Sequence, residues 1–346
     1  MAPTLRVGLI GFGLAGQAFH APAIRAVPGV QLACILERRS DRAKQTYPDV
    51  RVARTLDELL ADQEIRLCVI ATPNTSHVEL AKQCLTAGRD VVLDKPFTNT
   101  SQEAAELIAF AAQRKRLLTV YHNRRWDGDF LTVKKLVQSG VLGRLVEMES
   151  HFDRFRPQVK PGAWREQPGS GSGMLYDLAP HLLDQAFTLF GLPQAVTANV
   201  SCQRDGAQAD DAFDVRLDYP ELSVLLRSSM LAGAPGPRFL LRGTRGTFVK
   251  YSFDPQEDTQ REGWYSPVWS EHPEPQWGTL YLSEGESLKE QKVRVETDDH
   301  RGFYENVRDA ILDGAPLAVT AEDGARTIRA IELALESARQ RRTIPW

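Results

Sequence analysis

Two polar residues, Asp177 and His181, are spaced so that they could move a proton together. They lie four apart in LYDLAPHLLDQ, Leu175–Gln185, so a helix would present both on one face. Histidine exchanges a proton near neutral pH, as the interconversion of an alcohol and a ketone requires. Pro180 is disfavoured inside a helix. The alternative is a helix that begins near Asp177, with Asp177 as its cap and His181 as an ordinary buried histidine.

A lysine that could hold a reacting oxygen lies in Asp94-Lys95-Pro96, directly after the apolar run Val91–Leu93. If that run is a strand of a parallel sheet, its carboxyl end lines the ligand crevice. There Lys95 can donate to a substrate hydroxyl or carbonyl and stabilise a developing alkoxide. The alternative is an ordinary surface lysine.

The stretch Arg6–Gly16, RVGLIGFGLAG, has the spacing G-x-G-x-x-G between a predicted strand and a predicted helix. The first glycine permits a tight turn, the second lets a pyrophosphate approach the backbone, and the third permits close packing of the helix. Free N–H groups at the helix start attract the phosphates. We therefore predict a dinucleotide site formed by Gly11, Phe12, Gly13, Leu14, Ala15 and Gly16.

The choice between NAD and NADP depends on the end of the second predicted strand. Glu37 lies about twenty residues past the glycines, where a carboxylate binds the adenosine ribose hydroxyls of NAD. Arg38, Arg39 and Ser40 follow it and could instead hold the 2′-phosphate of NADP. Because a carboxylate repels a phosphate, we predict NAD, with NADP as the alternative.

Another loop, Ala71–Asn74, follows the next predicted strand and is expected at the same edge of the sheet. Thr72 or Asn74 could equally cap the helix that follows. We assign these residues to the cofactor side: Ala71, Thr72, Pro73, Asn74, His77, Asp94, Lys95 and Pro96.

The elements that position these residues alternate between short apolar strands and amphipathic helices. Strands are predicted at Leu5–Ile10, Val30–Leu36, Leu67–Ala71, Val91–Leu93 and Leu117–Val120. Helices are predicted at Gln17–Val27, Asn74–Ala87 and Ser101–Arg114. This alternation predicts an α/β fold with a doubly wound parallel sheet, as in a Rossmann domain.

After Tyr121 the pattern changes to strands with two-residue periodicity, which is typical of an antiparallel sheet. Strands are predicted at Val196–Gln203, Phe213–Tyr219, Leu222–Leu226, Arg238–Arg242 and Thr247–Tyr251, and helices at Trp126–Ser139, Phe303–Leu312 and Glu322–Arg339. The polar stretch Asp254–Gln291, with Trp264, Trp269 and Trp277, is interpreted as a long excursion. We predict two domains: residues 1–121 for the dinucleotide, and residues 122–346, an α+β domain with a mostly antiparallel open sheet, for the substrate.

Composition predicts an ordinary globular protein. The chain has 346 residues, of which 42% are hydrophobic and 25% charged. A net charge of −3 gives no footprint for nucleic acid or for an anionic membrane. Three of the four cysteines, Cys34, Cys68 and Cys84, lie in apolar patterns and are expected to be buried thiols. No metal site is predicted, and the strand that begins so close to the N-terminus leaves no room for a secretory signal, so we expect a cytoplasmic protein.

Three stretches together resemble the Gfo/Idh/MocA family of oxidoreductases: GFGLAG at Gly11–Gly16, DKPFTNT at Asp94–Thr100, and LYDLAPHLLDQ. The family pattern usually has Glu-Lys-Pro, where this sequence has Asp94. The resemblance implies an NAD(P)-dependent enzyme whose catalytic residues are Lys95, Asp177 and His181. It also implies a homodimer or homotetramer that associates through the open sheet.

A closer likeness lies in VYHNRRWDGDFLTVKKL, Val120–Leu136, in Arg154–Arg156 and in the Trp164-Arg165 pair. These stretches resemble the scyllo-inositol dehydrogenase branch, which interconverts scyllo-inositol and scyllo-inosose and often uses NADP. The resemblance implies that Asn123, Trp164 and Arg165 lie near the nicotinamide. It implies that Arg124 and Arg156 lie on the substrate side, with Lys95, Asp177 and His181. A network of ion pairs is the alternative for the arginines.

The sequence therefore predicts an NAD(P)-dependent oxidoreductase that interconverts a hydroxyl of a cyclic polyol or sugar with its ketone. Its expected partner is a small-molecule substrate. Two alternatives remain open. One is an NAD(P)-binding sensor without turnover. The other is different chemistry on the same scaffold, such as reduction of biliverdin, an imine or a sugar, or cleavage of a glycoside.

Overall fold

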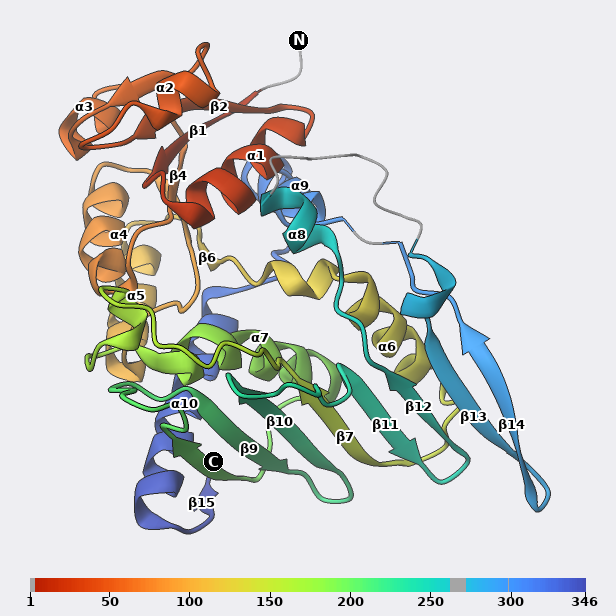
Figure 1. The fold of residues 1–346 in the computed structure, drawn as a ribbon. Helices are drawn as coiled ribbons and strands as arrows, with labels where there is room; N and C mark the ends of the chain where they lie inside the picture. Colours follow the sequence, from red (N-terminus) through yellow and green to blue (C-terminus); the bar gives the residue numbers. More distant parts are fainter. Residues whose placement is uncertain (1–3, 262–271, 298) are drawn as a thin grey trace. The chain divides into compact units, whose positions relative to one another are not determined.

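The computed structural model describes residues 4–261, 272–297 and 299–346 (Figure 1). These residues form two compact units. Unit 1 contains residues 4–123, 255–261 and 299–326, and unit 2 contains residues 124–254, 272–297 and 327–346. The chain therefore returns to unit 1 twice. The predicted domains, 1–121 and 122–346, are each one continuous segment, and that division stays a prediction. Within the described ranges, no helix has the length and apolarity needed to cross a membrane.

A parallel six-stranded sheet forms the centre of unit 1, in the order β3-β2-β1-β4-β5-β6. Its strands are β1 (Leu5–Ile10), β2 (Val30–Leu36), β3 (Arg51–Ala53), β4 (Leu67–Ile70), β5 (Asp90–Leu93) and β6 (Leu118–Val120). All residues of β4, β5 and β6 are buried, as expected for strands covered on both faces. This is the Rossmann strand order, which places a ligand crevice at the carboxyl ends of β1 and β4.

The helices of unit 1 come from both ends of the sequence (Figure 1). They are η1 (Gly16–His20, a π-helix), α1 (Ala21–Ala26), α2 (Arg42–Thr46), α3 (Leu56–Leu60), η2 (Asn74–Ser76), α4 (His77–Thr86), α5 (Ser101–Gln113), α8 (Gln256–Arg261) and α9 (Arg301–Asp313). The segment 299–326 is hydrogen-bonded to the sheet, because Thr119 Oγ1 of β6 donates to the Val319 carbonyl at 2.7 Å.

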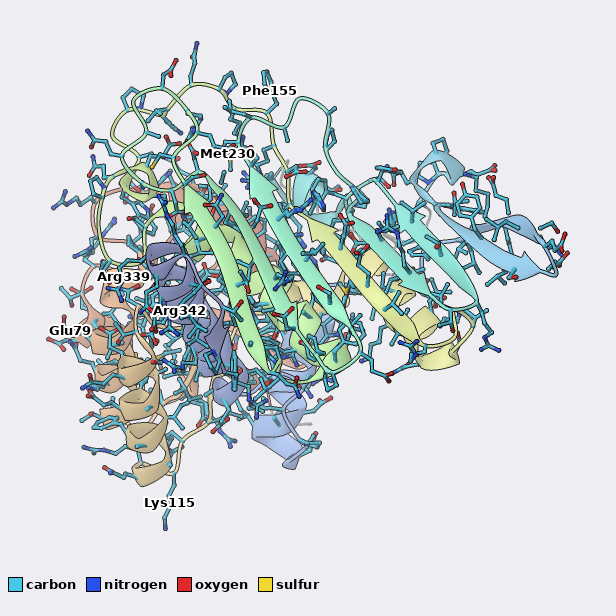
Figure 2. The ribbon with its side chains drawn as sticks, turned by 90° about the horizontal axis from the view of Figure 1, so that it is seen from below. Glu79, Lys115, Phe155, Met230, Arg339 and Arg342 are labelled. Carbon is cyan, nitrogen blue, oxygen red and sulfur yellow. The ribbon has the colours of Figure 1, made fainter. Side chains whose placement is uncertain are left out.

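A nine-stranded sheet forms the centre of unit 2, in the order β14-β13-β12-β11-β7-β10-β9-β8-β15, and Figure 2 shows its strands side by side. The strands are β7 (Leu145–His151), β8 (Ala195–Ser201), β9 (Ala212–Asp218), β10 (Ser223–Ser229), β11 (Phe239–Gly243), β12 (Gly246–Lys250), β13 (Gly278–Glu284), β14 (Ser287–Val293) and β15 (Ile344–Pro345). Only β7 and β10 pair in parallel. The predicted mostly antiparallel sheet is therefore confirmed.

The helices associated with unit 2 are α6 (Gly128–Ser139), η4 (Trp164–Glu166), α7 (Gly173–Phe190) and η5 (Glu274–Gln276). The α7 helix packs on β9 and β10. Two elements contain residues of both units, η3 (Asn123–Trp126) and α10 (Ala321–Gln340).

One interpretation of the sequence was wrong, and one alternative that the sequence left open is excluded. The described parts of Asp254–Gln291 are not an excursion: they hold the helices α8 and η5, and also β13 and part of β14, two strands that extend the nine-stranded sheet. Trp264 and Trp269 lie outside the described residues. Asp177 is not a helix cap, because α7 begins at Gly173 and continues through Pro180. Pro180 has no N–H to offer the Tyr176 carbonyl, but the helix tolerates this loss.

The start of α7 requires a glycine. Gly173 has φ +85°, and a Cβ there would lie 1.9 Å from Asp210 Oδ1. The same carboxylate caps the helix, because its Oδ2 accepts from the Leu175 N–H at 2.7 Å.

We expect Gly173→Ala to lower the free energy of unfolding by about 2–4 kcal/mol, because it adds both backbone strain and a clash. Thermal or urea unfolding measures this loss. Gly169→Ala is the matched control, since the nearest atom to its Cβ would be 3.9 Å away. Equal stability of the two variants would contradict the requirement at Gly173.

Candidate active site

The glycine loop after β1 has the geometry that a dinucleotide needs. Gly11 has φ +101°, and a Cβ there would lie 2.7 Å from the Ala71 carbonyl oxygen. A Cβ on Gly16 would lie 2.3 Å from the Gly11 carbonyl oxygen, so η1 can begin directly against the turn. By contrast, no described atom lies within 4 Å of a Cβ built on Gly13. This open approach beside a helix start fits a pyrophosphate.

Leu14 is 55% exposed in this loop, whereas Phe12 is buried and packs edge-on against Tyr47, with ring centroids 6.1 Å apart. Phe12 therefore anchors the loop on its own unit, and Leu14 and Gly13 form its open side. Ala15, between Leu14 and Gly16, has intermediate exposure.

The Glu37 side chain is turned into the loop that follows β2. Only 6% of the residue is exposed. Its Oε2 accepts from the Ala43 N–H at 2.9 Å, and Oε1 accepts from the Ser40 hydroxyl. Both oxygens thus stabilise the start of α2. Arg38 and Arg39, which come next, are exposed, and neither forms an ion pair with another described residue.

His77 joins the two loops at the carboxyl ends of β4 and β5. Its Nε2 lies 3.0 Å from the Thr72 carbonyl oxygen and its Nδ1 lies 3.0 Å from the Pro96 carbonyl oxygen. Burial lowers the pKa of His77, against the opposing effect of the Asp94 charge. A neutral ring has one N–H and can donate to only one of these carbonyls. We assigned His77 to the cofactor side. In the structure its ring spans the two loops.

The neighbouring loop residues are also held in place. Thr72 Oγ1 lies 2.7 Å from Ser76 Oγ, and Asn74 is buried at the start of η2. The Ala71 N–H donates to the Ile10 carbonyl at 2.9 Å, which continues the pairing of β1 with β4 beyond the strand. The edge of the sheet is therefore a set of short, bonded loops.

Lys95 stands in a charged environment. Its N–H donates to Asp94 Oδ1 at 2.7 Å, and His20 Nε2 lies 3.8 Å from the same oxygen. Burial raises the pKa of Asp94, but the interactions with His20, Lys95 and His77 outweigh burial and hold that pKa below its usual range. Asp94 therefore stays ionised beside Lys95 at neutral pH.

Asn123 is held by residues that come much later in the chain. Its Nδ2 lies 3.3 Å from His300 Nδ1, and Gln260 Nε2 lies 3.1 Å from the same nitrogen. The His300 N–H in turn donates to Gln256 Oε1 at 2.9 Å. Asn123, which the sequence assigned to the nicotinamide, therefore belongs to a buried polar group in unit 1.

In unit 2, α7 carries Asp177 and His181 one turn apart, as the spacing predicts. His181 is buried, and its ring is stacked on Phe152 with centroids 6.4 Å apart. Asp177 Oδ1 lies 3.3 Å from Arg165 Nε, and the Arg165 guanidinium lies 4.6 Å from the centre of the Trp164 ring. The structure thus brings together four of the residues predicted for this site.

Phe152, which follows β7, is a further candidate site residue that sequence reasoning missed. The guanidinium carbons of Arg124 and Arg154 lie 4.8 and 5.3 Å from the centre of its ring. Arg124 also pairs with Asp127 at 3.1 Å. The sequence shows Phe152 and the arginines, but nothing in it indicates that the arginines and His181 contact the same aromatic ring.

Arg156 is placed by its backbone, whose N–H donates to the Met230 carbonyl at 2.7 Å; its side chain is exposed. Figure 2 shows Met230 and the adjacent Phe155 beyond the ends of the strands, where the chain leaves β7 and β10. Phe155 is 63% exposed, while Met230 is buried. The backbone at Arg156 is therefore held by a hydrogen bond to the loop that follows β10. Among the described residues, no group of three or more His, Cys, Asp or Glu side chains could hold a metal ion.

Comparison with known proteins identifies the family to which the chain belongs. Residues 5–122 match the family model described as the NAD-binding Rossmann fold of an oxidoreductase family, and residues 134–346 match its C-terminal alpha/beta domain. The chain is 45% identical to the Escherichia coli uncharacterized oxidoreductase YdgJ, over 99% of each chain. It is 38% identical to the Bacillus subtilis scyllo-inositol 2-dehydrogenase (NADP(+)) IolW, over 99% of this chain and 96% of the relative.

A solved structure of yvaA from Bacillus subtilis superimposes with a TM-score of 0.95 at 37% identity, over 100% of this chain and 99% of the other. The fold and the dinucleotide loop define an NAD(P)-dependent oxidoreductase. The chain belongs to the Gfo/Idh/MocA oxidoreductase family, which confirms the predicted resemblance.

Two glycine variants separate binding from folding in the dinucleotide loop. Gly13→Ala is expected to leave thermal stability unchanged but to weaken binding of the reduced dinucleotide by at least about tenfold, because its methyl occupies the open approach. Gly16→Ala is expected to lower thermal stability, because its methyl meets a carbonyl oxygen. Fluorescence titration and thermal unfolding distinguish the two effects. Unimpaired binding by Gly13→Ala would refute the assignment.

Proposed function

We propose that this oxidoreductase interconverts a hydroxyl of a cyclic polyol or sugar with its ketone, and that an inositol-like ring is the favoured substrate. The observation that carries this proposal is the pair on α7, a buried histidine one turn from a carboxylate. Hydride transfer from an alcohol requires a base for the hydroxyl proton, and the site offers His181. A sensor that only binds the dinucleotide needs no such base.

In the proposed oxidation, three residues have separate tasks. His181 accepts the hydroxyl proton, while Lys95 donates a hydrogen bond to the same oxygen and stabilises its developing charge. Asp177 binds an adjacent hydroxyl or steadies His181. The oxidised nicotinamide, when bound, accepts the hydride from the carbon. Reduction of the ketone uses the same groups in reverse.

The preference for an inositol-like ring has two supports. The relative IolW is named a scyllo-inositol 2-dehydrogenase. Arg124 and Arg154 lie over the Phe152 ring, which is stacked on His181, and Arg165 pairs with Asp177. The donors of these arginines suit hydroxyl oxygens better than a flat apolar pigment.

The first test measures the change in nicotinamide absorbance with inositols, inososes and aldoses, each offered with both cofactors. We expect turnover with scyllo-inosose and the reduced cofactor. Turnover with another substrate class alone would replace the proposed substrate. Tight binding of the dinucleotide without turnover across the panel would favour the sensor.

Lys95→Ala is expected to lower kcat by at least about a hundredfold and to leave dinucleotide affinity nearly unchanged, because the lost interaction is strongest in the transition state. Lys82→Ala is the matched control: Lys82 is a surface residue of α4 that pairs with Glu106 at 3.9 Å. A normal kcat for Lys95→Ala would refute the role of Lys95.

We further propose that NADP is the preferred cofactor, against the prediction that Glu37 favours NAD. The support is the loop after β2, where both Glu37 oxygens accept hydrogen bonds within the loop. The exposed Arg38 and Arg39 are suited to a 2′-phosphate. The printed name of IolW also specifies NADP(+).

We expect kcat/KM to be at least about tenfold higher with NADPH than with NADH. Arg38→Ala and Arg39→Ala should each lower the value for NADPH and leave that for NADH unchanged. Arg114→Ala, at the exposed end of α5, serves as the control for loss of a surface guanidinium. If Glu37→Gln selectively weakens NADH instead, Glu37 binds the ribose and the sequence prediction of NAD is right.

A further inference from the structure

A buried histidine outside the proposed catalytic set lies against the Asp94 carboxylate. His20 ends the π-helix η1 and is 0% exposed. Its Nε2 lies 3.8 Å from Asp94 Oδ1, and its Nδ1 lies 2.6 Å from the Tyr304 hydroxyl. Three elements from distant parts of the sequence thus meet in unit 1: the first helix, the loop after β5, and α9.

The packing around His20 leaves its ring little freedom. The ring lies against Tyr121, with centroids 4.2 Å apart, and near the ring of Tyr304 at 6.2 Å. Tyr304 is itself 1% exposed and packs edge-on against Phe303 at 5.2 Å. A histidine enclosed in this way is fixed in orientation, so each of its nitrogens keeps one neighbour.

The neighbours decide which nitrogen carries the proton. A tyrosine hydroxyl that donates to Nδ1 leaves the single N–H of a neutral imidazole on Nε2. That N–H then lies beside Asp94 Oδ1, 3.8 Å away, which is beyond hydrogen-bond distance but close enough for electrostatic attraction. The same carboxylate oxygen accepts a hydrogen bond from the Lys95 N–H at 2.7 Å. The arrangement orders Tyr304, His20, Asp94 and Lys95 in one chain of contacts.

We propose that His20 and Tyr304 are positioning residues that hold the Asp94 carboxylate, and through it Lys95, in the geometry required for hydride transfer. This inference rests on the proposed function of Lys95. Neither residue is assigned a contact with the substrate, since both are buried. They act by fixing the direction and the ionised form of the carboxylate on which the Lys95 backbone rests.

Two further features support a functional role for this contact. A π-helix is rare in proteins and occurs frequently at functional sites, and η1 ends at His20. In addition, a deeply buried histidine–tyrosine pair is a costly way to fill a core that aromatic residues alone could fill.

The primary test is Tyr304→Phe, which keeps the ring packing and removes only the hydroxyl. We expect kcat to fall roughly tenfold, a coupling common between contacting residues, while KM and dinucleotide affinity change little. Tyr219→Phe is the matched control, because it also removes a single donor, to the Gly191 carbonyl at 3.0 Å, in the other unit. Equal activities of the two variants would overturn the proposal.

A double-mutant cycle tests whether the effect passes through Asp94. If His20 and Tyr304 act by positioning this carboxylate, Tyr304→Phe has no further effect on kcat in an Asp94→Asn background. Additive losses would overturn the proposed route. Thermal unfolding of each variant shows whether it folds. If Tyr304→Phe does not fold, His20→Asn takes its place in the cycle with Asp94→Asn.

The pH profile gives a readout that lost packing alone would not move. The titratable groups that face Asp94 are His20 from η1, His77 from α4 and Lys95 in its own loop, and all three favour the ionised carboxylate. Without His20, burial raises the Asp94 pKa unopposed by that partner. Activity that needs the carboxylate is lost as pH falls through its pKa. The acidic limb of kcat/KM in His20→Gln should therefore shift to higher pH, and an unchanged limb would overturn the proposal.

One measurement separates this inference from the proposed function. Nitrogen NMR chemical shifts of His20, recorded where imidazole is neutral, report its tautomer without any turnover. We expect the proton on Nε2 in the wild-type protein and a mixture of tautomers in Tyr304→Phe. A proton on Nδ1 in the wild type overturns the positioning chain even if the enzyme is active. If the tautomer is the expected one but the protein shows no turnover, the proposed function is wrong and the positioning chain stands.

Discussion

The candidate site depends on the close approach of Gly16, which has no side chain, to the carbonyl oxygen of Gly11. Because Gly16 has no Cβ, the first helix of the Rossmann unit can begin against the Gly11 carbonyl. That position sets the path of the π-turn and brings its last residue, His20, to Asp94. The same turn leaves Gly13 open. A single steric constraint at Gly16 thus bears on both the loop predicted to bind the dinucleotide and the residues proposed to position Lys95.

The parallel sheet was predictable because its strands are buried on both faces and read as short apolar runs. The predicted bounds of β1 and β2 agree with the structure residue for residue. β3 has only three residues and β14 is almost entirely exposed, so neither carries a hydrophobic signal. β14 is a strand because it pairs with β13, an interaction that periodicity cannot report. The spacing of Asp177 and His181 predicted their shared helix, whereas a local rule about Pro180 suggested a later start.

What the sequence could not provide is contact between residues that are far apart along the chain. His20 and Tyr304 are separated by 284 positions. Phe152 can be grouped with the candidate site residues only once α7 places His181 beside it. Glu37 shows a subtler limit. Its position after β2 was predicted correctly, but the direction of its carboxylate depends on the Ala43 N–H and the Ser40 hydroxyl. Residue type and spacing indicate which chemistry is available, and the fold decides where it is directed.

The return of the chain to unit 1 affects how the protein is made. Arg66, next to β4, donates to the Ile311 carbonyl at 2.7 Å, and Thr119 of β6 donates to the Val319 carbonyl, so the Rossmann sheet is bonded to residues that are translated long after it. While the ribosome is still adding the nine-stranded sheet, the first 123 residues lack α9, and His20 lacks the hydroxyl beside it. A gene fragment that ends after β6 therefore encodes a cofactor-binding motif without its completed core. Unit 1 is compact in space, but it is built from three separate segments of the chain and cannot be transferred to another protein as one continuous segment.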